Sequence, residues 1–338
     1  MKTDTNNTLM NNQPLLRVSD LKVHFNIQEQ NTIFSRKQTL KAVDGISFEL
    51  NAGETLGVVG ESGCGKSTLA RGILQLIKPS GGDVFLSGQS VASLSKAELR
   101  EQRKNMQIIF QDPLAALNPR MTLFQIISEP LTVFEKNLSK PEMKERVFSI
   151  MEKVGLSKHL INRYPHEFSG GQCQRIGIAR ALILKPKLII CDEPVSALDV
   201  SIRAQIVNLL MDLQKEMNLA LIFIAHDLHI VKHISHKIMV MYLGKAVEVG
   251  LSDDVYTNPT HPYTKALISA VPEPDPKKNK LKTKQFLEGD LPSPLNPPSG
   301  CAFRTRCPLA VEKCALSTPE LLERNSNETG RYIACHEV

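Results

Sequence analysis

The chain has 338 residues, of which 42% are apolar and 22% are charged, a composition typical of a globular protein with one large domain or two ordinary ones. Its longest apolar run, Leu219 to Ala225, has the length of a buried strand, whereas a bilayer span needs about 20 apolar residues. The composition therefore excludes a membrane-spanning protein. A formal net charge of +6 permits an anionic partner.

The N-terminal residues are polar and rich in asparagine, without the apolar core or small-residue cleavage site of a secretory signal. We expect residues 1–14 to be a disordered lead. We also expect the protein to stay in a reducing compartment, where its seven cysteines act as thiols or metal ligands. The one dense basic run, Lys277 to Lys284, is interpreted as a solvated linker, with contact to an anionic membrane or nucleic acid as the alternative.

The first clear unit along the chain is an apolar strand, Glu54 to Gly60, followed by a glycine-rich turn and a helix, Lys66 to Ile77. A more helical stretch over about 112–180 then interrupts the pattern and is a candidate helical subdomain. A second buried strand, Lys187 to Cys191, follows it. This alternation predicts an α/β fold whose ligands lie at the carboxyl ends of the strands.

Further along, apolar residues at helical spacing predict a helix over Val200 to Met217, and the strand Leu219 to Ala225 leads directly to His226. After about residue 258 the chain becomes rich in proline and the strand signals stop. We therefore expect a catalytic domain over residues 15–258 and a C-terminal extension over 259–338.

The segment Gly60 to Thr68 reads GESGCGKST and fits the phosphate-loop pattern G-x-x-x-x-G-K-[ST] between a strand and a helix. Its glycines let backbone N–H groups turn toward phosphate oxygens, and the helix presents its positive end to them. Lys66 is expected to neutralise the β- and γ-phosphates, and Ser67 to ligate Mg²⁺. A turn with only a structural role is the alternative, which the flanking strand and helix disfavour.

Two carboxylates, Asp192 and Glu193, follow the second buried strand at the edge where the phosphates would lie. Because an acidic pair repels a triphosphate unless a cation intervenes, Asp192 is interpreted as a Mg²⁺ ligand through water. Glu193 is the candidate base that deprotonates the attacking water. A solvated strand end is the alternative.

The segment Phe168 to Arg175, FSGGQCQR, resembles the signature of ABC-type ATPases. The resemblance implies a P-loop NTPase with a RecA-like core, a helical subdomain and head-to-tail pairing of two chains. The loop that would close on the partner's ATP consists of Ser169, Gly170, Gly171 and Gln172. Cys173 departs from the polar or basic residue common at that position, but the signature itself is intact and we expect an active site.

The same resemblance assigns further roles. Gln111 matches the position that senses Mg²⁺ and water and links to the membrane subunits, and His226 matches the histidine that contacts the γ-phosphate. Ser196 to Asp199 matches the loop that touches the opposite site. Phe25 is the candidate for stacking on adenine, with a core phenylalanine as the alternative.

The expected site has three sets of residues. The catalytic set is Lys66, Glu193 and His226. The Mg²⁺ ligands are Ser67, Gln111 and Asp192. The ATP-binding set is Phe25, Gly60, Glu61, Ser62, Gly63, Cys64, Gly65, Lys66, Ser67, Thr68 and Gln111.

Longer segments, among them RYPHEFSGGQ, HPYTKALISAVP and GDLPSPLNPPSGC, resemble the F-type ATP-binding subunits of dipeptide and oligopeptide importers. This resemblance implies ATP hydrolysis coupled to peptide uptake at the cytoplasmic face of the inner membrane. It implies as partners a D-type ATPase, two permeases and an extracytoplasmic peptide-binding protein, and no nucleic acid. The alternatives are a soluble ABC-type ATPase outside transport and an iron-sulfur sensor on an ATPase scaffold.

The C-terminal extension holds four cysteines, at positions Cys301, Cys307, Cys314 and Cys335. Structural zinc sites usually contain a pair of ligands two to four residues apart, and these four do not. Four thiolates with longer spacing suit a four-iron, four-sulfur cluster, which members of the resembling family hold. Zinc with His336 as a substitute ligand, or reduced structural thiols, remain the alternatives.

Overall fold

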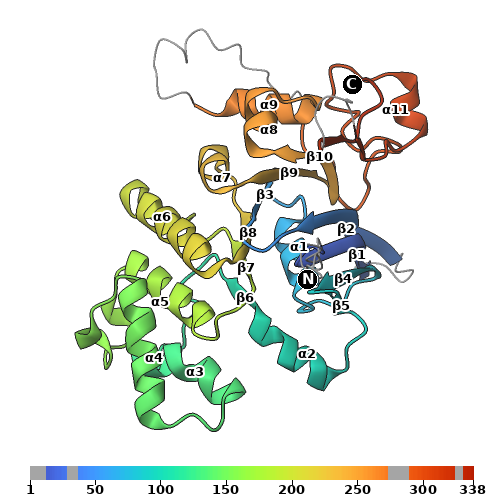
Figure 1. The fold of residues 1–338 in the computed structure, drawn as a ribbon. Coiled ribbons are helices and arrows are strands. Elements are labelled where there is room, and N and C mark those ends of the chain that lie inside the picture. Colours follow the sequence, from blue (N-terminus) through green and yellow to red (C-terminus); the bar gives the residue numbers. More distant parts are fainter. Residues whose placement is uncertain (1–12, 29–36, 273–288, 324–329) are drawn as a thin grey trace, which may run out of the picture.

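The computed structural model describes residues 13–28, 37–272, 289–323 and 330–338 (Figure 1). Most of the expected N-terminal lead and the whole basic run Lys277 to Lys284 lie outside these described residues. Within them, no helix is both long enough and apolar enough to span a membrane.

The core of the fold is an eight-stranded sheet with the order β11-β12-β10-β9-β3-β8-β7-β6. Its central strands are parallel and carry the phosphate-loop and carboxylate motifs at their carboxyl ends. They are β3 (Thr55–Val59), β6 (Met106–Ile109), β7 (Leu188–Asp192), β8 (Ala220–Ile224) and β9 (Lys237–Tyr242). In β3, β7 and β8 every residue is buried, because both faces of the sheet are covered.

A second, four-stranded sheet is antiparallel and has the order β2-β1-β4-β5. Its strands are β1 (Leu16–Gln28), β2 (Lys37–Leu50), β4 (Gly81–Leu86) and β5 (Gln89–Ser90). Helix α1 (Lys66–Ile73) packs between the two sheets, since its Leu69 and Ile73 belong to the same apolar cluster as Leu21 of β1 and Leu188 of β7. The start of this helix is thereby held at the edge of the parallel strands.

Helix α1 ends four residues before the predicted boundary at Ile77. Leu74 caps it, and Gln75 then adopts φ +52, a left-handed conformation that cannot continue a right-handed helix. The predicted helix over Val200 to Met217 is present with those bounds as α6, and it ends at Asn218 in the left-handed conformation.

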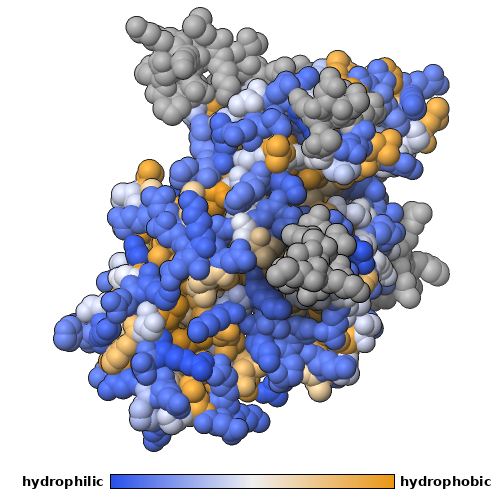
Figure 2. Space-filling view, in the orientation of Figure 1, coloured by the Kyte–Doolittle hydropathy of each residue, from blue (hydrophilic) through white to orange (hydrophobic). Residues whose placement is uncertain are grey.

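The stretch between β6 and β7 forms a lobe of three α-helices, on the lower left of Figure 1. These are α3 (Leu123–Phe134), α4 (Lys140–Lys153) and α5 (Gly170–Leu182). Capping boxes begin all three, as Ser139 and Glu142 do for α4. In Figure 2 apolar residues gather over this lobe on a largely hydrophilic face.

Five further α-helices occur among the described residues. They are α2 (Lys96–Gln102), α7 (Leu228–Ile234), α8 (Ser252–Thr257), α9 (Pro262–Ala270) and α11 (Glu312–Leu316). Short 3-10 turns occur at Arg103–Asn105, Lys158–Leu160 and Pro165–Glu167.

Two short strands of the C-terminal extension belong to the large sheet. The sequence did not predict this attachment, because it shows no strand pattern after about residue 258. Strand β10 (Lys245–Leu251) pairs with β12 (Tyr332–Ile333), which in turn pairs with β11 (Leu322–Glu323). Strands of two residues are too short for an alternating pattern to reveal them. Tyr332 and Ile333, close to the end of the chain, therefore lie beside β10.

Candidate nucleotide site

The phosphate loop joins β3 to α1, as predicted. Gly65 precedes the helix with φ +105, and a Cβ there would collide with the carbonyl oxygen of Ala42, so only glycine fits. No side chain caps the start of α1, which leaves its first N–H groups available to an anion. The Lys66 ammonium is buried and donates to the carbonyl oxygens of Gly60 at 2.8 Å and Glu61 at 3.0 Å.

Ser67 and Asp192 face each other across the junction of α1 and β7. The Ser67 hydroxyl donates to Asp192 Oδ1 at 2.8 Å, and Asp192 is only 5% exposed. Burial raises the pKa of this carboxyl, although the hydrogen bond from Ser67 acts in the opposite direction. A hydroxyl and a carboxylate are oxygen ligands of the kind that Mg²⁺ prefers, so these residues fit the predicted ion.

Glu193 is held by two neighbours on one carboxylate oxygen. Gln111 Nε2 donates to Oε2 at 3.1 Å, and His226 Nδ1 lies 3.6 Å from the same oxygen. The Glu193 backbone has φ +48, a conformation that is uncommon outside glycine and that functional residues often adopt. The three residues come from the ends of β6, β7 and β8, where the parallel strands bring them together.

A cavity of about 360 Å³ lies where these motifs meet. Of the predicted residues, it is lined by Phe25, Ser62, Gly63, Gly65, Lys66, Ser67, Thr68, Gln111 and Glu193. The predicted residues that do not line it are Gly60, Glu61, Cys64, Asp192 and His226. The first three belong to the phosphate loop, while Asp192 contacts Ser67 and His226 lies beside Glu193. Lining residues that the motifs did not reveal are Leu40, Lys41, Ala42, Leu243, Gly244 and Pro294.

The signature loop lies at a different cavity, of about 470 Å³, which is lined by Ser169, Gly171, Gln172, the segment that follows α4 and further residues of α5 and α6, but by none of the phosphate loop. Ser169 caps α5, and its hydroxyl accepts from the Gln172 N–H while Gln172 Oε1 accepts from the Ser169 N–H at 3.0 Å. The phosphate loop and the signature loop of one chain therefore lie at separate cavities.

Cys173, the departure from the signature pattern, points into the protein. It is fully buried, its thiol donates to the Pro165 carbonyl oxygen at 3.6 Å, and burial raises its pKa. The replacement therefore leaves the exposed face of the signature loop unchanged.

The four tail cysteines gather in one region without forming a site for a single metal ion. The Cys301 N–H donates to the Cys314 carbonyl oxygen at 2.8 Å. Burial raises the pKa of the Cys301 and Cys307 thiols, and the charges of the other tail cysteines raise it further. Yet among the described residues no three histidine, cysteine or acidic side chains are placed to hold a metal ion. His336, the substitute ligand, has its Nε2 3.0 Å from the Ser317 carbonyl oxygen.

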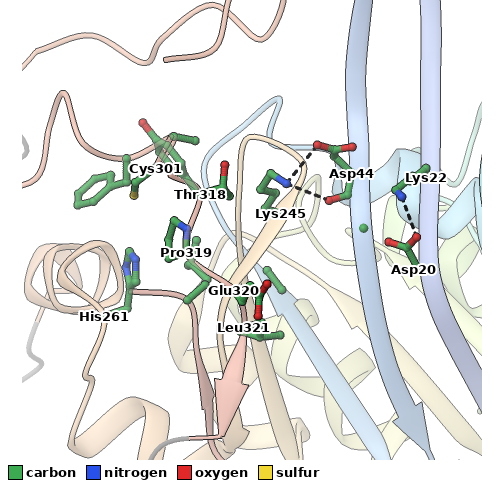
Figure 3. Close-up of a pocket in the computed structure, with 17 residues that line it drawn as sticks. Asp20, Lys22, Asp44, Lys245, His261, Cys301, Thr318, Pro319, Glu320 and Leu321 are labelled. Carbon is green, nitrogen blue, oxygen red and sulfur yellow. Dashed lines mark hydrogen bonds and ion pairs between the residues drawn. The ribbon is translucent and has the colours of Figure 1, made fainter. Parts of the chain in front are cut away.

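Cys301 also borders a larger cavity, of about 510 Å³, between the extension, β1, β2 and β10 (Figure 3). Two of its lysines pair with aspartates that also line it, Lys245 with Asp44 at 3.1 Å and Lys22 with Asp20 at 2.7 Å. Apart from Cys301, none of the predicted site residues lines this cavity.

Two family profiles match this chain, one in the ATPase domain and one that reaches into the C-terminal extension. The family profile described as ABC transporter matches residues 43–196, and the one described as Oligopeptide/dipeptide transporter, C-terminal region, matches residues 247–314. The oligopeptide transport ATP-binding protein OppF of Salmonella typhimurium is 63% identical over 91% of this chain and 92% of its own length. OppF of Haemophilus influenzae is 60% identical over 98% of this chain and 99% of its own length.

Solved structures share the ATPase fold. CbiO1 of Clostridium perfringens, part of the ABC transporter complex cbiONQ, is 28% identical with a TM-score of 0.62 over 72% of this chain and 91% of its own. The ATP-binding cassette MJ0796, in a dimeric post-hydrolysis state bound to ADP and Pi, is 26% identical with a TM-score of 0.62, covering 70% of this chain and 98% of its own.

Proposed function

Because the chain belongs to the family of oligopeptide transport ATP-binding proteins among the ABC transporters, we propose that it is the ATP-binding subunit of an importer that couples ATP hydrolysis to peptide uptake. The observation that carries the proposal is the meeting of Lys66, Gln111 and Glu193 in one cavity at the carboxyl ends of parallel strands. The C-terminal match to peptide transporters supports the transport role over a soluble ABC-type ATPase.

Hydrolysis is assigned to the chain's own residues as follows. The phosphate-loop amides and Lys66 bind the β- and γ-phosphates. To do so, Lys66 gives up its hydrogen bonds to the carbonyl oxygens of Gly60 and Glu61 and donates to phosphate oxygens instead. Ser67, Asp192 and Gln111 would hold Mg²⁺, which would supply positive charge beside the phosphates. Glu193 accepts the proton of the attacking water, while Gln111 and His226 fix the orientation of its carboxylate.

The adenine and the second chain complete the site. Phe25 and Lys41 line the cavity from the antiparallel sheet, where an aromatic ring is available to stack on the base. The signature loop, which lies at its own cavity, closes on the ATP of a partner ATPase, for which a D-type subunit is proposed. The loop Ser196 to Asp199, which Val200 follows with 81% of its surface exposed at the start of α6, is proposed as part of the pairing surface.

The membrane-facing role rests on the residues around Gln111. Phe110 and Leu114 are 38% and 53% exposed beside it, next to the helical lobe. Apolar side chains at this place suit a permease contact that reports ATP binding to the membrane subunits. The proposal therefore places the chain peripherally on the cytoplasmic face, with two permeases and a peptide-binding protein as partners.

The direct test is reconstitution of the chain with its co-encoded ATPase, permeases and binding protein in liposomes. Peptide uptake and ATP hydrolysis should rise together on addition of peptide and binding protein, and Glu193→Gln in this chain should abolish the increase. Hydrolysis that runs at the same rate without permeases or peptide would instead support a soluble ABC-type ATPase.

For the tail we further propose a four-iron, four-sulfur cluster on Cys301, Cys307, Cys314 and Cys335. What supports it is the gathering of the four thiols in one part of the extension, where burial and the charges of neighbouring cysteines raise the pKa of the Cys301 and Cys307 thiols. Such a cluster would supply redox or iron responsiveness outside the ATP site. Anaerobically purified protein should contain four irons and four sulfides, lost in Cys301→Ser and kept in Cys173→Ala. One zinc per chain, or no metal, would contradict the proposal.

A further inference from the structure

The C-terminal extension makes a paired ionic contact with the phosphate loop. Arg306 Nη1 donates to Glu61 Oε2 at 2.8 Å and Nη2 donates to Oε1 at 3.1 Å, across 245 residues of chain. The Arg306 side chain is only 8% exposed and Glu61 is 27% exposed. Two parallel hydrogen bonds between planar groups fix orientation as well as distance, so this contact positions the loop residue that bears the carboxylate.

The backbone of Glu61 is held from the same side. Its N–H donates at 2.9 Å to the hydroxyl of Tyr263, a fully buried residue of α9. Its carbonyl oxygen accepts from Lys66 Nζ at 3.0 Å. Glu61 thus has three anchors, of which two, Arg306 and Tyr263, belong to the region that matches the peptide-transporter C-terminal profile.

A cluster of aromatic rings fixes the two anchors relative to each other. Phe303, three residues before Arg306, packs with Tyr263 at 5.4 Å and with Tyr242 at 5.3 Å between ring centres. Tyr242 and Tyr263 pack at 4.7 Å. The hydrogen bond with Glu61, together with the neighbouring Tyr242 hydroxyl, raises the pKa of the Arg306 guanidinium. Arg306 is therefore a permanent cation on a rigid support.

These anchors matter most at the moment ATP binds. To reach the phosphates, Lys66 must release the carbonyl oxygens of Gly60 and Glu61, and the loop then loses its internal tie. The contacts of Glu61 with Arg306 and Tyr263 do not involve the phosphate-binding atoms and can persist. They keep the loop in the shape that its N–H groups need to surround the phosphates.

We propose that Arg306, acting through Glu61, is a positioning residue of the ATP site, so that the peptide-transporter extension sets the affinity of this chain for ATP. The inference rests on the proposed function only in taking the phosphate loop as the ATP site. Pro294 of the same extension lines the nucleotide cavity, which gives the extension a second approach to the bound nucleotide.

The test measures affinity for a fluorescent ATP analogue on the isolated chain and KM and kcat of the assembled complex. Arg306→Ala should raise Kd and KM for ATP about tenfold, which is about 1.4 kcal/mol, with kcat changed less than about twofold. Arg306→Lys should recover part of the loss, since a single ammonium cannot bind both carboxylate oxygens. Arg304→Ala is the matched control, because Arg304 lies in the same loop but donates to Ser299 and not to Glu61.

Glu61→Gln provides a second variant, of unchanged shape, in case Arg306→Ala does not fold. It should weaken ATP binding like Arg306→Ala, and the double variant should bind no worse than either single one. An unchanged Kd in Glu61→Gln and Arg306→Lys, with only a lower melting temperature, would overturn the proposal and leave a docking contact. If affinity shifts as expected but peptide never stimulates the wild-type complex, the transport role fails and the positioning role stands.

Discussion

The Ser67 hydroxyl and the Asp192 carboxylate meet at 2.8 Å at the boundary between the phosphate loop and the sheet. The contact joins a residue at the start of α1 to the last residue of β7, 125 positions later. Asp192 is a buried carboxylate, and burial raises its pKa although the Ser67 hydroxyl and the charges of Arg71 and Lys66 act in the opposite direction. The proposed Mg²⁺ ligand Asp192 thus destabilises the nucleotide-free fold.

Asp192→Asn should therefore stabilise the nucleotide-free chain while removing Mg²⁺-dependent hydrolysis. Because the folded-state pKa is raised, the folded chain holds this proton more tightly, and the carboxylate lowers stability progressively as the pH rises above its unfolded value of 3.8. For Asp192→Asn we expect a rise in melting temperature of about 2 °C at pH 7. Thermal unfolding at pH 7 without Mg²⁺ checks this, with exposed Asp212→Asn as control; a lower melting temperature for Asp192→Asn contradicts it.

Glu193→Gln should reduce kcat by about 10² to 10⁴ while ATP binding persists, since the amide cannot take the proton of water but keeps the shape of the side chain. His226→Ala should have a smaller effect, because Gln111 still holds Glu193 at 3.1 Å. Single-turnover hydrolysis and nucleotide binding measured side by side separate the two steps. Exposed Glu145→Gln is the control. Wild-type turnover in Glu193→Gln would assign the base elsewhere.

The separation of the two anion-binding loops predicts complementation between chains. Ser169→Arg should leave ATP affinity of the isolated chain unchanged, because Ser169 lies at a different cavity from Lys66. Lys66→Ala should abolish that affinity. In the assembled complex both variants should lower hydrolysis, Ser169→Arg at the partner's site and Lys66→Ala at this chain's own. Loss of ATP binding in isolated Ser169→Arg would place the signature in the chain's own site.

His261 makes the fold sensitive to acid. Burial lowers its pKa from 6.5 to about 4, against a smaller opposite effect of a hydrogen bond with the Ala334 backbone. Its Nδ1 accepts from the Tyr263 backbone N–H at 3.1 Å, and the His261 backbone N–H donates to the Glu248 carboxylate at 2.9 Å. The unfolded chain takes up a proton near pH 6.5 and the folded chain only near 4, so the stabilisation is complete above 6.5 and declines as the pH falls below it.

This decline should amount to about 2 kcal/mol at pH 5. His261→Asn keeps an acceptor for the start of α9 and removes the titrating ring, so its unfolding free energy should fall less between pH 7.5 and pH 5. Urea unfolding at the two pH values measures the difference, with exposed His159→Asn as control. If the unfolding free energy falls by the same amount between pH 7.5 and pH 5 in wild type and His261→Asn, another group causes the acid sensitivity.

The nucleotide motifs could be predicted because their chemistry is local. The segment Gly60 to Thr68 holds its glycines, lysine and serine in nine consecutive residues, and Asp192 and Glu193 follow one buried strand. The ABC ATPase fold is confirmed by the matching cassettes. Resemblance named Phe25, which a single aromatic in a strand pattern could not have revealed.

Contacts made by the extension could not be predicted in the same way. The pairing of Glu61 with Arg306 depends on β12 docking on β10 and on the packing of Phe303, and neither leaves a periodic signal. The spacing of the tail cysteines could not predict a metal site in the same way, because spacing sets only the largest distance between two thiols. Where the thiols point depends on the folded loop between Cys301 and Cys314, and there the described residues form no single-ion site.

The distance in sequence between Glu61 and Arg306 has a consequence for synthesis. A ribosome adding about 5 to 20 residues per second needs roughly 12 to 49 seconds to progress from the first to the second across 245 positions. Until then the nascent phosphate loop has Lys66 as an anchor but neither Arg306 nor the docked tail. A chain truncated before residue 306 would emerge with every ATP motif in place, and its phosphate loop would be held by Lys66 and Tyr263 without the ionic contact of Arg306.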